Sequence, residues 1–175
     1  MAGTSIELNP FEIEVIDLLI TSIAKQQNKT YYRRNPVDSA KNIFTAQKEG
    51  ICAELAFCKI KNLYPDLSIH EKVQLVDCVW RGYKVDVKNT TTGRLLIQKD
   101  DSGVFGNPIE IYVLMIGKIP RYQYFGWAWK WELIRRENIR NLGDYHHKPF
   151  CLDIPALHTE DPTPKQSIMR ELDKA

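Results

Sequence analysis

The uninterrupted apolar run IYVLMIG at residues 111–117 constrains the fold more than any other feature of this sequence. The run lacks the alternation of apolar and polar residues that a half-exposed strand shows, so it predicts a strand buried on both faces. Such a strand needs a layer of structure on each side. We therefore expect it to lie centrally in a sheet that carries helices.

Other elements follow from hydrophobic periodicity and turn residues. Helices are predicted at about residues 10–27, 44–63 and 132–142, and strands at residues 69–80, 83–89, 94–98 and 124–131, with a short extended piece near 150–154. The first helix begins at Asn9-Pro10-Phe11-Glu12, which supplies an N-cap, a proline at the first helical position and a capping-box glutamate. The fold class that we expect is α/β, with a mixed central β-sheet flanked by α-helices.

Length and composition indicate one domain in a reducing compartment. The chain has 175 residues, of which 43% are hydrophobic, and we expect a single domain at residues 1–160 followed by a tail at 161–175. The four cysteines form no CxxC pair, and the sequence has neither a secretory start nor a run long enough to span a bilayer. We therefore expect a cytoplasmic protein without a membrane partner. The net charge of +2 permits a nucleic-acid partner without requiring one.

The stretch VQLVDCVWRGYKVDVK at residues 73–88 predicts a β-hairpin that turns at Arg81-Gly82. A two-residue turn pairs Trp80 with Tyr83, Val79 with Lys84, Cys78 with Val85 and Asp77 with Asp86. The two carboxylates then stand opposite each other, roughly 5 Å apart at Cβ, and Lys88 lies on the same face. A three-residue loop with a bulge at Gly82 would break this register.

Two carboxylates that face each other must share a proton or find a cation. Hard divalent ions such as Mg²⁺ or Mn²⁺ prefer carboxylate oxygens, so a metal site is one interpretation of the pair. The other interpretation is a solvated hairpin face that Lys88 partly neutralises.

Glu54 favours the first interpretation, because its neighbours three and four positions away on the predicted helix are all uncharged. A glutamate on an apolar helix face points toward the sheet, where it needs a partner such as a metal-bound water or Lys88. The alternative is that Glu54 lies at the edge of the apolar stripe and reaches solvent or Lys84.

Together these residues resemble the PD-(D/E)XK nuclease superfamily. GICAELAF, with Glu54, resembles the helix that carries the leading acid of the family, and GYKVDVKNT, with Asp86-Val87-Lys88, resembles its (D/E)xK strand. The resemblance covers about residues 45–131, and one departure is that Val76 rather than proline precedes Asp77. It implies a restriction-endonuclease-like fold and metal-dependent hydrolysis of phosphodiester bonds, with DNA a better expectation than RNA.

The same resemblance implies roles for individual residues. Asp77, Asp86 and the backbone carbonyl of Val87 would bind Mg²⁺ or Mn²⁺. Glu54 would bind a metal ion through water or hold a second ion, and Lys88 would orient the attacking water. Gln98 is an accessory candidate, with a plain edge residue as its alternative. Within the family, a restriction-type, junction-resolving or phage-type endonuclease fits a chain of this size, and a symmetric substrate would require a homodimer.

Contacts with nucleic acid are expected mainly from a basic and aromatic stretch. The residues are Tyr32, Arg33 and Arg34, with Lys41 nearby and with the hydroxyls of Thr90 and Thr91 beyond the (D/E)xK strand. A solvated loop and an ordinary polar turn are the alternatives for these two groups. Trp127, Trp129 and Trp131 alternate along one predicted strand, and we expect them to pack in the core.

Two functions of other classes stay open at this stage. One is a protein of nuclease fold that binds nucleic acid without cutting it, and the other is a structural or interaction protein.

Overall fold

A computed structural model describes residues 3–27, 40–65, 67, 76–98, 105–142 and 148–166 of the chain. The main elements, in chain order, are β1 (Thr4–Glu7), α1 (Pro10–Gln27), α2 (Ala40–Lys61), β2 (Cys78–Trp80), β3 (Tyr83–Asn89), β4 (Arg94–Ile97), β5 (Ile111–Lys118), β6 (Arg121–Trp129), α3 (Lys130–Leu133) and β7 (Phe150–Asp153). Two 3₁₀ turns, η2 (Arg136–Asn138) and η3 (Ile154–Ala156), flank β7.

Five strands form a mixed sheet in the order β1-β6-β5-β3-β2. β3 and β5 are parallel, and the other neighbouring pairs are antiparallel. β4 and β7 pair separately in an antiparallel ribbon. The apolar run forms β5, the middle strand of the sheet, and Ile111–Met115 are all buried. The predicted α/β class and central strand are therefore confirmed.

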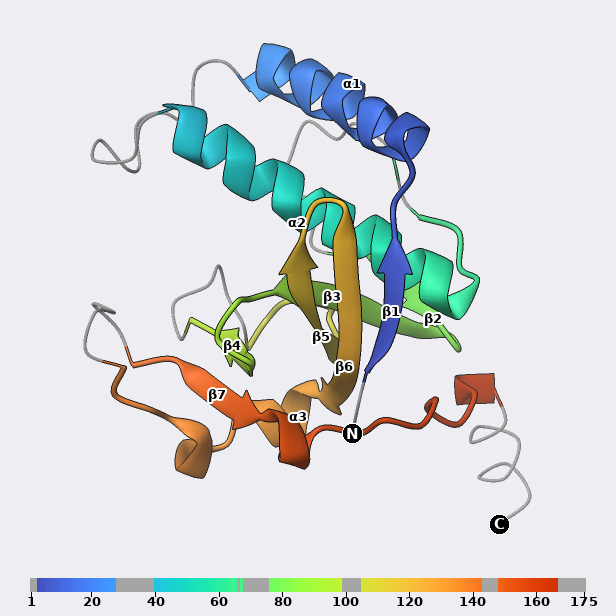
Figure 1. Cartoon of the computed structure of the whole chain (residues 1–175). Coiled ribbons are helices and arrows are strands. Elements are labelled where there is room, and N and C mark those ends of the chain that lie inside the picture. Colours follow the sequence, from blue (N-terminus) through green and yellow to red (C-terminus); the bar gives the residue numbers. More distant parts are fainter. Residues whose placement is uncertain are drawn as a thin grey trace.

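Two hydrophobic layers cover the sheet. One holds α1 and α2 against one face, with α2 between α1 and the strands, and the other holds β4, β7 and α3 against the opposite face (Figure 1). Side chains of β5 alternate between the two layers, with Val113 in the first and Leu114 in the second. This alternation explains why the strand reads as uniformly apolar.

The start of α1 is confirmed in detail. The Asn9 side chain accepts a hydrogen bond from the Glu12 N–H at 2.9 Å, and the Glu12 carboxylate accepts one from the Asn9 N–H at 2.7 Å. These reciprocal bonds form a capping box that satisfies N–H groups left free at a helix start.

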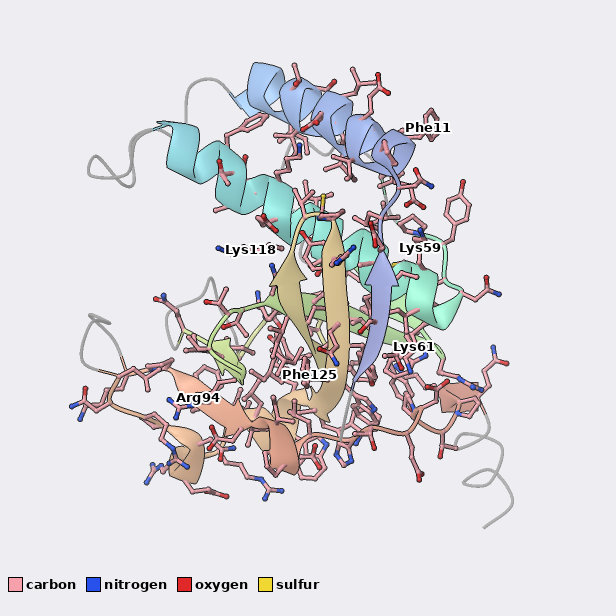
Figure 2. All side chains as sticks on the ribbon, in the orientation of Figure 1. Phe11, Lys59, Lys61, Arg94, Lys118 and Phe125 are labelled. Carbon is pink, nitrogen blue, oxygen red and sulfur yellow. The ribbon has the colours of Figure 1, made fainter. Side chains whose placement is uncertain are left out.

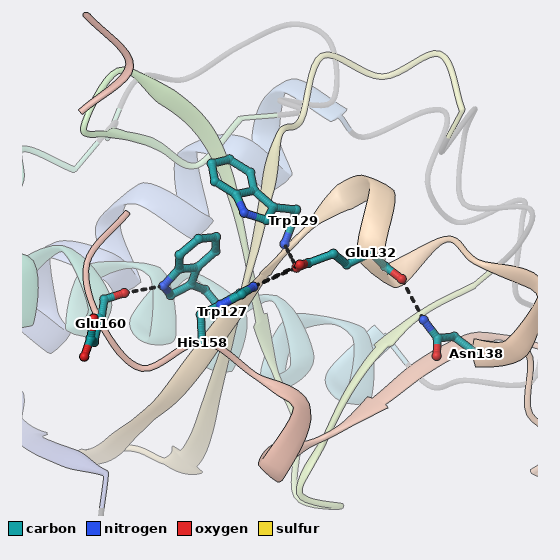
Figure 3. A network of polar contacts seen from close by, with 6 residues as sticks. All are labelled: Trp127, Trp129, Glu132, Asn138, His158 and Glu160. Carbon is teal, nitrogen blue, oxygen red and sulfur yellow. Dashed lines mark hydrogen bonds and ion pairs between the residues drawn. The ribbon is translucent and has the colours of Figure 1, made fainter. Parts of the chain in front are cut away.

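The C-terminal part of the described chain lies along β6. Backbone N–H groups of Trp127 and His158 each donate to the carbonyl of the other residue, at 2.9 and 2.8 Å. The Trp127 indole N–H donates to the Glu160 carbonyl at 2.7 Å, and His158 contacts the Glu132 carboxylate at 2.9 Å (Figure 3). Asp161 accepts from Lys61 and Arg81, so residues on both sides of position 160 contact the sheet.

The predicted helix at 132–142 is wrong. α3 has four residues, and the Asn138 side chain donates to the carbonyls of Glu132 and Leu133 at its end (Figure 3). An amide that bonds the last carbonyls ends a helix, because it replaces the next turn.

The predicted packing of the three tryptophans is only partly confirmed. Trp127 is buried and Trp129 packs against the same layer, but Trp131 lies in α3 rather than in the strand and is 57% exposed. Because the chain leaves the strand at Lys130, the period-two pattern no longer sets the direction of Trp131.

Two strand assignments also change. β1 was not predicted, and the predicted strand at 69–80 is observed only at Cys78–Trp80, since residues 68–75 lie outside the described residues.

Among the described helices, none has both the length and the apolar character needed to cross a bilayer.

Candidate metal and phosphodiester site

The hairpin has the predicted register from the turn to Cys78. Trp80 pairs with Tyr83, Val79 with Lys84 and Cys78 with Val85. Arg81 and Gly82 both have positive φ, at 55° and 89°, as expected of the two central residues of a tight hairpin turn, so the alternative with a bulge at Gly82 is wrong. The predicted pairing of Asp77 with Asp86 is not part of the observed ladder. The Asp77 N–H instead donates to the Val85 carbonyl at 2.9 Å, which marks an irregularity at the end of β2.

Asp77 bonds the edge of β3 with its side chain. Its Oδ2 accepts a hydrogen bond from the Val87 N–H at 2.6 Å. Backbone groups of alternate residues in a strand point to the same side, so the Val87 carbonyl points toward Asp77 as well. The Lys84 carbonyl points to the other side of β3, where it accepts a hydrogen bond from the Glu110 N–H. The Val87 carbonyl, which the resemblance implies as a metal ligand, therefore faces Asp77, which would bind the same ion.

Asp86 and Lys88 form an ion pair on β3. The Lys88 ammonium lies 2.9 Å from Asp86 Oδ2, and the two side chains are 34% and 18% exposed, respectively. In the parallel ladder their partners are Tyr112 and Leu114, which belong to the layer that contains β4 and β7. Asp86 and Lys88 therefore lie on that side of the sheet.

Glu54 approaches the same acids from α2. Burial raises the pKa of Glu54 well above its ordinary value, and the nearby Asp77 and Asp86 raise it further, while Lys88 opposes them. Val85 and Val87 pack in the layer that contains α2, whereas Asp86 lies on the opposite face. Glu54 and Asp86 therefore influence each other electrostatically from opposite faces of β3. Glu54 itself is half-buried, so the alternative in which it lies at the edge of the apolar stripe stays a prediction.

Burial and neighbouring charges also raise the pKa of Asp77. Burial raises the pKa of Asp77 to about 7, the neighbouring Asp86 adds to the rise, and the Val87 N–H and Lys88 oppose it. Three carboxylates and one ammonium therefore share a poorly solvated region. Removing charge there, by protons or by a cation, is favourable.

A hard divalent cation fits the chemistry of these donors, because all of them are oxygen atoms and their charges repel one another. The geometry is less complete, since no group of three or more His, Cys, Asp or Glu side chains among the described residues is arranged as a metal site. A bound ion would have to draw the carboxylates together.

No family model matches the sequence. No curated protein and no solved structure matches it significantly either. Any function of this chain therefore has to be inferred from its own residues.

The other predicted contacts lie in the turn after β3, directly after β4, or outside the described residues. The Thr90 hydroxyl accepts from the Thr92 N–H at 3.0 Å, so it stabilises a polar turn, and Thr91 in that turn is exposed. Gln98 directly follows β4, in the separate ribbon, and is partly buried. Tyr32, Arg33 and Arg34 lie outside the described residues, as does the side chain of Lys41 in the first turn of α2.

Two thiols that sequence reasoning treated separately lie beside the acids. Cys58 is one turn after Glu54, and Cys78 follows Asp77. The two thiols are hydrogen-bonded to each other, which lowers the pKa of Cys58 and raises that of Cys78. Both are buried, as expected of core cysteines. The sequence places Cys58 one turn after Glu54 and Cys78 directly after Asp77, but it does not show that α2 brings the two thiols together.

Proposed function

We propose that this protein is a metal-dependent nuclease of the PD-(D/E)XK type, with a restriction-endonuclease-like fold, that hydrolyses phosphodiester bonds in DNA. The observation that carries the proposal is the electrostatic coupling of Glu54, Asp77 and Asp86 beside Lys88. An acid from a helix and two acids from a hairpin influence one another electrostatically. Surface solubility alone does not account for three half-buried acids that raise one another's pKa.

The arrangement of elements supports the proposed fold. The helix that carries Glu54 packs on the strand that carries Asp86, and that strand belongs to a mixed sheet covered on both faces. The resemblance over residues 45–131 implies this order of helix, hairpin and later strands.

Asp77, Asp86 and the Val87 carbonyl would hold Mg²⁺ or Mn²⁺, and Glu54 would hold the ion through water or hold a second one. When bound, the metal ion lowers the pKa of a coordinated water and stabilises charge on the phosphate. The protein contributes the crowded carboxylates, which gain from a cation. It also contributes the Val87 N–H, which fixes one oxygen of Asp77.

Lys88 would act on the reacting groups. Its ammonium already lies within 2.9 Å of Asp86, so it is held next to the acid that would carry the metal. A fixed positive charge there orients a water and offsets negative charge that develops on the phosphate.

A second candidate is a nucleic-acid-binding protein of the same fold that does not cleave. The observation in its favour is that the described acids are not arranged as a closed metal site, while Lys88 already neutralises Asp86 in part. Against it, buried carboxylates beside a phosphate weaken binding unless a cation lies between them.

Cleavage assays distinguish the two. Purified protein is incubated with linear, circular and branched DNA and with RNA, in Mg²⁺, Mn²⁺ or EDTA. We expect cleavage of DNA with either metal, none in EDTA and none by Asp86→Ala. The control Asp153→Ala, which removes an exposed acid paired with Arg94, should cut like the wild type. Binding without cleavage under all conditions would favour the second candidate, and metal-independent cleavage by Asp86→Ala would contradict the proposed site.

A further inference from the structure

Trp131 is a large aromatic side chain that the core does not use. It is 57% exposed, whereas Trp80 and Trp127 are buried. The guanidinium of Arg135 lies 4.8 Å from the centre of its ring, so an arginine covers part of the indole without enclosing it. An exposed aromatic ring held by a cation is suited to stacking on another planar group.

The chain around Trp131 is basic. In the parts of residues 131–148 that the structure describes, the exposed cations are Arg135, Arg136, Arg140 and Lys148, and the exposed acid is Glu137. Arg135 lies 3.8 Å from Glu137, and the Arg140 guanidinium donates to the Glu137 carbonyl at 2.7 Å. We call Trp131 and these four cations the Trp131 patch.

Hydrogen bonds hold the segments that carry the Trp131 patch. Glu132, next to Trp131, accepts from the Trp129 N–H at 3.0 Å and contacts His158 at 2.9 Å, while Asn138 bonds the end of α3 (Figure 3). The Arg140 N–H donates to the Pro149 carbonyl at 3.0 Å, which brings Lys148 beside Arg140. The cations therefore come from two segments that are joined by backbone bonds.

The patch and the candidate site share one side of the sheet. Leu133 of α3 is buried in the layer formed with β4 and β7, and the ladder partners of Asp86 and Lys88 lie in that same layer (Figure 1). β6, from which α3 continues, is separated from β3 by β5 alone, so the two strands are roughly 10 Å apart. A bound polymer could reach both.

We propose that the Trp131 patch binds single-stranded nucleic acid, with a base stacked on Trp131 and the phosphates beside Arg135, Arg136, Arg140 and Lys148. Among the described residues from Trp131 to Lys148, four exposed cations against one exposed acid give the charge complementarity that a phosphate backbone requires. The exposed indole supplies the contact that a polyanion without bases would not use. This inference takes its substrate class from the proposed function, but it does not depend on cleavage.

The test measures binding in EDTA, where cleavage does not occur. Labelled oligo-dT, oligo-rU, a DNA duplex and inorganic polyphosphate are titrated with the full chain, and binding is followed by fluorescence anisotropy over a range of salt. We expect Trp131→Ala to weaken oligo-dT binding roughly tenfold, the loss of one stacked base, and to leave polyphosphate binding unchanged. Arg136→Gln with Arg140→Gln should reduce the salt slope for oligo-dT by about 1.4, at about 0.7 per phosphate contact.

Matched controls remove the same groups elsewhere. Phe11→Ala removes an exposed aromatic residue from α1, on the other side of the sheet (Figure 2). Arg121→Gln removes an exposed arginine at the start of β6 that pairs with Glu7 of β1. Both should bind like the wild type. Because Arg140 also bonds the Glu137 carbonyl, Arg136→Gln alone serves as a second variant, with an expected decrease in slope of about 0.7.

The outcomes separate this inference from the proposed function. If the wild type binds none of the four probes, or if Trp131→Ala and Phe11→Ala bind oligo-dT equally, the patch assignment is wrong, whatever the chain cleaves. Loss of oligo-dT binding in Trp131→Ala supports the patch even for a chain that cleaves nothing. A stronger preference for the duplex than for oligo-dT would also overturn it.

Discussion

At the scale of single residues, Lys88 is the side chain whose proposed role is most specific. It contacts Asp86, it opposes the raised pKa of Glu54 and Asp77, and it is partly exposed. A structural lysine would stabilise the acids, whereas a catalytic lysine would act on substrate.

We predict that Lys88→Ala retains binding of metal and of DNA but cleaves on the order of a hundredfold to a thousandfold more slowly, as expected when one charge-stabilising group is lost. The matched control is Lys84→Ala, an exposed lysine on the same face of β3 that should cleave normally. The measurement is the single-turnover rate with saturating Mn²⁺. Cleavage by Lys88→Ala at the wild-type rate would show that the assigned role is wrong.

A second prediction concerns Asp77 and the pH dependence of stability, and its test needs neither metal nor substrate. Its pKa is raised from 3.8 to about 7, so the folded protein binds a proton there that the unfolded chain releases above its ordinary pKa. Stability from this group is therefore present at low pH and is lost as pH rises from about 4 to about 7.

Asp77→Asn, which keeps an acceptor for the Val87 N–H, should remove this loss. In EDTA, we expect the stability of the variant relative to the wild type to increase by on the order of 2 kcal/mol between pH 5 and pH 8. Urea unfolding at both pH values measures this, with the exposed Asp153→Asn as control. The same difference at pH 5 and pH 8 would contradict the burial of this carboxylate.

At the scale of elements, the hairpin was predictable and α3 was not. Arg81-Gly82 between two period-two segments determines the register, because a tight turn fixes which residues face each other. α3 depends on Asn138, whose side chain crosses to Glu132 and Leu133, and a periodicity does not encode that contact.

β1 could not be predicted from the sequence either. It has four residues, its partner β6 is more than a hundred positions away in the chain, and its strand character comes from that pairing. Of the site, spacing indicated that Glu54, Asp77 and Asp86 influence one another, but not that Asp77 leaves the regular ladder. The pairing of Cys58 with Cys78 required knowing where α2 lies on β2.

The turn can be tested with two glycine-to-alanine substitutions that should change the free energy of unfolding in opposite directions. Gly82 has φ of +89°, and an added Cβ would lie 3.1 Å from Lys165 Cβ, so Gly82→Ala should destabilise the protein by about 1–2 kcal/mol. Gly50 lies in α2 with open space around it, so Gly50→Ala should stabilise by about 1 kcal/mol. Urea unfolding measures both. A stabilising Gly82→Ala would contradict the two-residue turn.

At the scale of the whole molecule, the two hydrophobic layers share one central strand. Because Val113 and Leu114 of β5 enter opposite layers, loss of one layer exposes the strand that supports the other. We predict one cooperative unfolding transition, in which tryptophan fluorescence and far-ultraviolet circular dichroism change together. Two separate transitions would show that the layers fold independently.

The central claim is that acids from α2 and from the hairpin share one divalent cation. Titration calorimetry with Mn²⁺ tests it most directly, on the wild type, Glu54→Gln, Asp86→Asn and the exposed control Asp153→Asn. We predict binding by the wild type and by Asp153→Asn, at least tenfold weaker binding by Glu54→Gln, and none by Asp86→Asn. Equal binding by the wild type and Asp86→Asn would contradict the claim, as would the absence of binding to the wild type.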